Sequence, residues 1–96
     1  MEDIKNLFSR EYTHWRVRAI EETKQFETFK KNIDDLQCMM HTHNFANYAS
    51  EDLVESMMEE LKRIGSVIEK NEVLGRTLKR RLLVQTAKML DELLNI

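Results

Sequence analysis

One stripe of large side chains constrains the fold of this chain more than any other feature. Its residues recur at alternating steps of four and three, which is the a and d spacing of a heptad repeat. A helix with such a stripe must bury it against other helices, because its apolar face would otherwise lie in water. We therefore expect a helix over about residues 3–41, interrupted on this face by the polar Glu22. We predict that its core seam consists of Phe8, Tyr12, Trp15, Phe26, Phe29, Ile33, Leu36 and Met40.

The composition agrees with a helical protein. The 96 residues include no proline and two glycines, Gly65 and Gly75, so the usual helix breakers are almost absent. The length favours a single domain over residues 1–96. A chain of this size buries only about 60–65% of the surface it exposes when unfolded, so an elongated helical form needs a partner or self-association.

A loop and a second helical region follow the first helix. Residues 42–49 carry the asparagine and histidine residues typical of turns. Ser50 is then a suitable N-cap for a helical region over about residues 50–95, with Glu51 and Asp52 at the positive end of the helix dipole. Asn71 either sets the register of this region or marks a break near 71–75, so one bent helix and two helices both remain open. The apolar seam of its first part is Val54, Met57, Leu61, Ile64 and Ile68.

We therefore predict an all-α fold, either a long helical hairpin or a three-helix antiparallel bundle with coiled-coil packing. The C-terminal part is apolar over about half its girth, which a single partner helix cannot bury. This favours association into a larger helical bundle. The predicted interface with a partner or a second copy is Leu78, Leu82, Leu83, Ala87, Leu90 and Leu94.

A basic cluster lies beside this apolar face. It is a solvated surface, a set of polar contacts to an acidic partner, or a cluster of the kind that directs nuclear import. The net charge of −2 and the lack of interleaved aromatic residues argue against nucleic acid as that partner. The cluster consists of Arg76, Lys79, Arg80 and Arg81.

The sequence contains no motif that indicates chemistry. No pairing of a nucleophile with a base and no glycine-rich phosphate loop is present, so we expect no enzymatic activity and no small-molecule ligand. Cys38, His41 and His43 have the donor types of a metal site, but their spacing matches no structural zinc pattern, so we expect no cofactor. The single cysteine indicates an intracellular, reducing compartment, cytoplasm or nucleus. No run of 18 apolar residues and no signal peptide is present, so no contact with a membrane is expected.

The stretch from Leu78 to Leu94 resembles the third helix of BAG domains. The likeness rests on Arg80, Arg81 and Val84 followed by a leucine-rich end, and it covers about 20 residues. Lys88 occupies the position of a glutamine in that family. The resemblance implies a three-helix bundle that binds the ATPase domain of a heat-shock chaperone, with Arg80 as one contact.

These observations predict a protein-interaction module, an assembly, adaptor or scaffold subunit that works as a homodimer or in a hetero-oligomer. A BAG-like co-chaperone module is the alternative.

Overall fold

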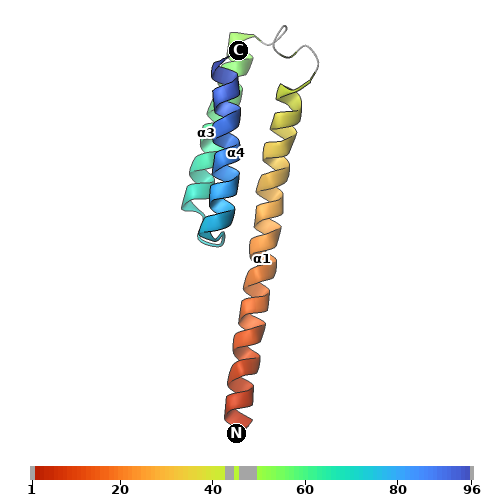
Figure 1. Cartoon of the computed structure of the whole chain (residues 1–96), viewed down its shortest axis with the longest axis vertical. Coiled ribbons are helices and arrows are strands. Elements are labelled where there is room, and N and C mark those ends of the chain that lie inside the picture. Colours follow the sequence, from red (N-terminus) through yellow and green to blue (C-terminus); the bar gives the residue numbers. More distant parts are fainter. Residues whose placement is uncertain (1, 43–44, 46–49, 96) are drawn as a thin grey trace.

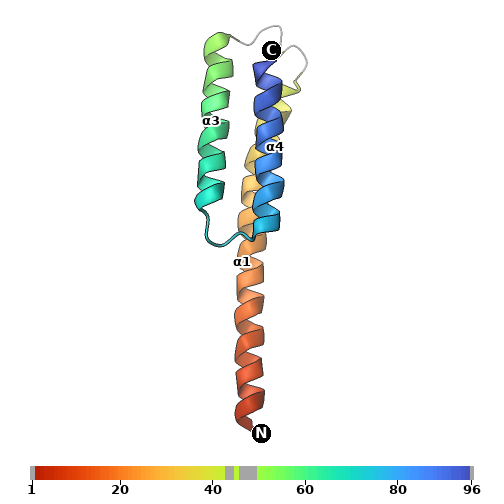
Figure 2. The same cartoon turned by 60° about the vertical axis from the view of Figure 1, so that its left-hand side comes forward.

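The computed structural model describes residues 2–42, 45 and 50–95, and the side chains of residues 2–9 and 11 are not among the described parts. The described residues form three helices, α1 (Glu2–Met40), α3 (Glu51–Lys70) and α4 (Arg76–Leu94). α3 runs antiparallel to α1, and α4 returns parallel to α1 (Figures 1 and 2). The described residues form no strand. The predicted all-α fold is confirmed in its three-helix form.

The molecule is elongated because its helices differ in length. It extends over 69 × 22 × 16 Å, and its radius of gyration of 18.9 Å exceeds the roughly 12–13 Å of a compact domain of this size. The 39 residues of α1 span about 58 Å, whereas the 20 residues of α3 span about 30 Å. Residues 2–21 of α1 therefore extend past the other two helices, as Figure 1 shows. We call this segment the overhang.

The core lies between the C-terminal half of α1 and the two shorter helices. The seam predicted for α3 is confirmed, since four of its five residues are buried and Val54 packs beside them. On α1, Phe26, Phe29 and Leu36 are half-buried and pack against the core. The buried apolar residues are Ile33, Met40, Met57, Leu61, Ile64, Ile68, Leu74, Leu82, Met89 and Leu93.

Side-chain caps define both ends of α3. The Ser50 hydroxyl accepts a hydrogen bond from the Leu53 amide at 3.2 Å, and Glu51 and Asp52 occupy the first turn, as predicted. At the other end, the Asn71 side-chain oxygen accepts hydrogen bonds from the amides of Val73 and Leu74, both at 2.8 Å. Asn71 therefore ends α3, and the region 50–95 contains two helices.

The turn between α3 and α4 is fastened to α1. The Asn71 side-chain amide donates to Gln25 at 2.6 Å, and the Gly75 backbone amide donates to the Glu22 carboxylate at 3.0 Å. A Cβ at Gly75 would lie 3.3 Å from that carboxylate oxygen, so a larger residue would push Glu22 away. Glu22, the polar exception in the stripe, therefore marks the level at which the bundle ends.

A polar network connects the middle of α1 with α4. The Lys30 ammonium donates to Asp34 at 2.8 Å and to Gln85 at 3.0 Å, and Gln85 donates to Asp34 at 2.8 Å and to Gln37 at 2.9 Å. The hydrogen bond from Lys30, followed by that from Gln85, lowers the pKa of the Asp34 carboxyl below its ordinary value. Contacts at successive levels keep α1 and α4 in register: Glu22–Gly75, Phe26–Arg81, Asp34–Gln85 and His41–Glu92.

The structure corrects the predicted core seam at its N-terminal end. Tyr12 and Trp15 are 68% and 62% exposed, because α3 and α4 do not reach this level of α1. The side chain of Phe8 lies outside the described parts. The seam prediction therefore holds from Phe26 to Met40 and is wrong for Tyr12 and Trp15 within a single chain.

Candidate functional site: two exposed helical surfaces

The first candidate surface is the stretch of the α1 stripe that lies on the overhang. Every residue from Tyr12 to Glu21 is exposed. Tyr12, Trp15 and Ala19 continue the heptad positions that are buried or half-buried from Phe26 onward, and we call these three residues the overhang face. Monomeric proteins bury aromatic side chains of this size where they can, so two adjacent ones in water indicate a surface for association.

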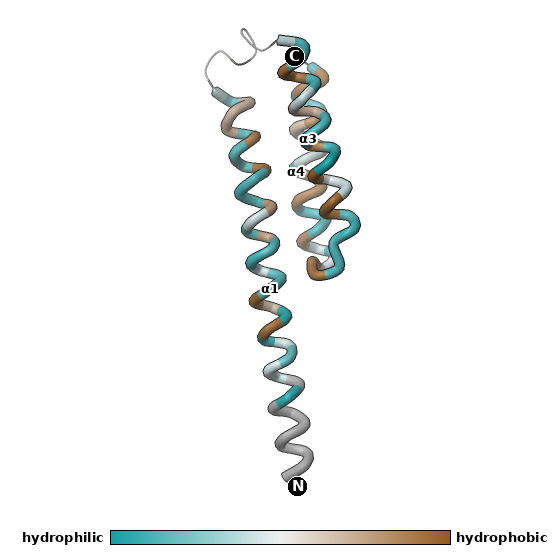
Figure 3. Tube along the Cα trace, turned by 180° about the vertical axis from the view of Figure 1, so that it is seen from behind, coloured by the Kyte–Doolittle hydropathy of each residue, from teal (hydrophilic) through white to brown (hydrophobic). Residues whose placement is uncertain are grey.

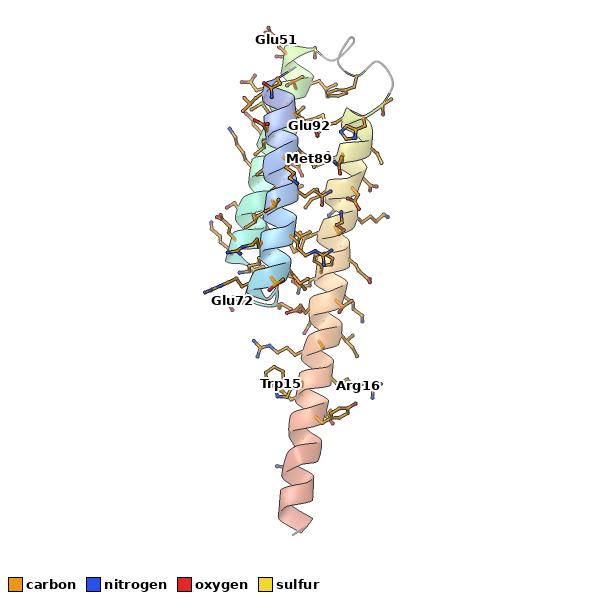
Figure 4. The ribbon with its side chains drawn as sticks, viewed as in Figure 1. Trp15, Arg16, Glu51, Glu72, Met89 and Glu92 are labelled. Carbon is orange, nitrogen blue, oxygen red and sulfur yellow. The ribbon has the colours of Figure 1, made fainter. Side chains whose placement is uncertain are left out.

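Trp15 of the overhang face points to the side of α1 on which α3 and α4 lie (Figure 4). Figure 4 shows Trp15 on that side and Arg16 on the opposite side. Hydrophobic residues continue along α1 past the level of the α3–α4 turn, as the hydropathy colouring of Figure 3 shows. Val17 and Ile20, 58% and 48% exposed, belong to the overhang but lie away from the overhang face on the helical wheel.

A recess lies between the overhang face and the turn that joins α3 to α4. It has a volume of about 360 Å³. Its walls come from α1 on one side and from the turn between α3 and α4 on the other, so a helix lying along the overhang would end against the turn. The lining residues are Trp15, Arg18, Ala19, Glu22, Glu72, Val73, Leu74 and Gly75.

The second candidate surface is a groove formed by α4, the end of α3 and the turn between them. It has a volume of about 620 Å³. Its floor is apolar, and three basic side chains surround it together with Glu69. The apolar floor consists of Leu74, Leu83, Val84 and Ala87, and the basic residues are Arg76, Lys79 and Arg80.

The predicted apolar interface on α4 is divided between the core and the surface. Leu82 is completely buried in the chain's own core, so it is unavailable to a partner, and this part of the prediction is wrong. Leu78, Leu83 and Leu90 are half-buried against the core. Ala87 and the 69%-exposed Leu94 lie at the surface.

The four basic residues also have different roles. Arg81 lies over the half-buried Phe26 ring, 5.1 Å from its centre, and so packs against the edge of the core. The Lys79 ammonium donates to the Glu69 carbonyl at 3.0 Å, which ties α4 to the end of α3. Arg76 and Arg80 are exposed at the groove.

The chemical motifs considered in the sequence do not assemble into a site. Among the described residues, no three His, Cys, Asp or Glu side chains come close enough to hold a metal ion. The His41 ring bonds to the Glu92 carboxylate at 2.9 Å, Cys38 is exposed, and His43 lies outside the described residues. No described helix combines the length and the apolar character needed to cross a membrane.

Comparisons with protein-family models, with curated proteins and with solved structures found no match for this chain.

Sequence reasoning missed Arg18 and Gln85, and it named Val84 only through the BAG resemblance. Arg18 and Val84 line the two surfaces, and Gln85 joins the α1 and α4 network. The heptad register, which places Arg18 beside the stripe, was the available signal for Arg18. Gln85 carried no such signal, because its partners are fixed only when α4 is docked.

Proposed function

We propose that this chain is a non-enzymatic protein-interaction module, an assembly or adaptor subunit that binds another helix. The observation that carries the proposal is the overhang face. Its heptad register continues unbroken from the buried half of α1, yet Tyr12 and Trp15 are both more than half exposed. The bundle supplies a rigid support, and the overhang supplies the surface.

The charge pattern supports a partner made of protein. The overhang carries both signs of charge within a few residues, as in Arg16, Arg18 and Glu21, whereas a surface for nucleic acid would concentrate positive charge. A stripe of heptad period is complementary to another helix, because its side chains enter the holes between four residues of the facing helix.

Photo-crosslinking in the cell that makes the protein tests this proposal. A photoreactive amino acid at position 15 is expected to capture a protein, either a second copy or a different chain. Position 17 is the matched control, because Val17 is equally accessible and lies about 200° from Trp15 on the helical wheel. If position 15 captures no more protein than position 17, the overhang face is not an interface.

A second candidate function is a BAG-like co-chaperone module that binds the ATPase domain of a heat-shock chaperone. What favours it is the exposure of Arg80 at an apolar groove on α3 and α4, together with the likeness of this helix to the third BAG helix. Arg80→Ala is expected to abolish capture of the purified ATPase domain, and Lys88→Ala, at another exposed basic residue of α4, should leave it unchanged. No binding by the intact chain would eliminate this candidate.

A further inference from the structure

We propose that the overhang face is occupied by the overhang of a second copy of this chain, packed antiparallel. The inference rests on the proposed function, since it names the partner of that same surface. The resulting dimer joins two three-helix bundles through a central pair of α1 segments. A second copy carries the same stripe at the same period, so it presents a complementary helix, and a twofold axis closes the assembly.

One register satisfies the apolar positions. In an antiparallel pair of helices, an a position of one copy lies opposite a d position of the other. Placing Tyr12 opposite Trp15 of the second copy creates two Tyr–Trp contacts around the axis, and the same register places Phe8 opposite Ala19. Aromatic pairs of this kind are favourable beyond the area they bury, and a large residue opposite a small one keeps the helices close.

The same register is complementary in charge. It aligns the glutamate at position 11 with Arg18 of the second copy along the flank. This alignment occurs twice because of the symmetry. A parallel pair would instead place the lysine at position 5 of one copy opposite the same lysine of the other within the seam, where like charges are most unfavourable.

The shape of the molecule also favours the antiparallel arrangement. α3 and α4 flank only the C-terminal half of α1 (Figure 2), so a parallel pair would bring both bundles to the same end of the dimer. An antiparallel pair places them at opposite ends, and each overhang reaches the recess below the other copy's α3–α4 turn.

The apolar area is consistent with a reversible dimer. An aromatic side chain buries about 150–250 Å², so the exposed parts of Tyr12 and Trp15 contribute roughly 500 Å² from the two copies. That is about a third of a standard interface, and the remaining area comes from the rest of the paired helices. We therefore expect monomers and dimers to exchange.

Light scattering and sedimentation of the full chain over a range of concentrations test the proposal. The intact chain is expected to approach twice its 11.5 kDa mass. Arg18→Glu, which places like charges in both symmetry-related alignments of positions 11 and 18, should raise the dissociation constant roughly tenfold or more. Arg16→Glu is the matched control and should change it by less than about twofold, because the antiparallel register aligns Arg16 with Ser9. The double change Glu11→Arg with Arg18→Glu should restore the dimer.

Three results would overturn the inference. The first is a monomer at every concentration, the second is an effect of Arg16→Glu at least as large as that of Arg18→Glu, and the third is no rescue by the double change. Circular dichroism should show the bundle intact in all variants, since these residues lie outside it. If the photoreactive amino acid at position 15 then crosslinks to a different protein, the proposal of an interaction module stands and the second copy is excluded as the partner. If that amino acid captures no protein, both proposals fail.

Discussion

Replacing Asn71 by alanine should destabilise the bundle more than any other single change at a polar side chain outside the core. The substitution removes the acceptor for the amides of Val73 and Leu74 and the donor to Gln25. Each lost hydrogen bond costs about 0.5–1.5 kcal/mol, and Leu74 is buried, so its amide has little access to water. We expect a total loss of about 2–3 kcal/mol in the free energy of unfolding.

Urea unfolding followed by circular dichroism measures this loss directly. For a domain of this size it corresponds to a fall in Tm of roughly 10–20 °C. Asn71→Asp is the informative control, because its carboxylate retains the acceptor, and the Gln25 amide can turn to donate to it. We expect Asn71→Asp to cost less than about 1 kcal/mol.

Two results would refute this reasoning about the turn. If the alanine and aspartate variants unfold at the same urea concentration, the Asn71 acceptor does not stabilise the end of α3. If Asn71→Ala increases stability, α3 and α4 have joined into one continuous helix, and the molecule should then sediment more slowly because it is longer.

The core, the surface, the pH dependence and the overhang each give one further prediction. Leu82→Ala should cost about 2–5 kcal/mol in urea unfolding, whereas Leu94→Ala, at an exposed position of the same helix, should cost less than about 0.5 kcal/mol. Because the pKa of Asp34 is lowered on folding, its contribution to stability is present above its unfolded pKa and is lost as the pH falls through the folded value. Asp34→Asn should therefore flatten the acid side of the unfolding profile and bring the wild-type and variant curves together at low pH. Trp15→Ala should leave the unfolding free energy of the monomer within about 0.5 kcal/mol of wild type, because α3 and α4 do not cover Trp15. A larger change in the unfolding free energy, measured in dilute protein, would contradict the exposure of Trp15 in the single chain.

The α3 seam was predictable because α3 lies against the bundle over its whole length. When one face of a helix is buried from end to end, the period of its apolar residues identifies that face, as Leu61 and Ile68 illustrate. The N-cap at Ser50 was equally local, since it depends on one side chain and the amide three residues later.

The extent of burial along α1 was not predictable from the stripe alone. A heptad pattern identifies the face that packs, but it does not say whether the chain's own helices reach that far. Trp15 and Phe26 have the same kind of position in the sequence, and only the end of the bundle at Glu22 separates them.

On α4, the predicted apolar face covered about half the girth of the helix, and pattern alone could not decide which part of it faces inward. The structure buries Leu82, Met89 and Leu93, and the last two were not part of the predicted interface. The Lys30–Asp34–Gln85 network was invisible for a different reason. Polar side chains on exposed faces have no period that identifies their partners, so these contacts appear only once α1 and α4 are docked.

The continuity of α1 across the end of the bundle has a consequence for how its exposed half becomes ordered. An isolated helix of this length is marginal in water because the first turn must form with few hydrogen bonds in return, a nucleation penalty of about 10⁻³ in the equilibrium constant. The overhang avoids that step, since the packed turns around Phe29 and Ile33 serve as a permanent nucleus. Each further residue only extends a helix that already exists. A partner therefore meets a surface whose helical order is set by elongation alone, and Val17→Gly, at a position away from the overhang face, would lower the affinity in a small step without removing a contact of that face.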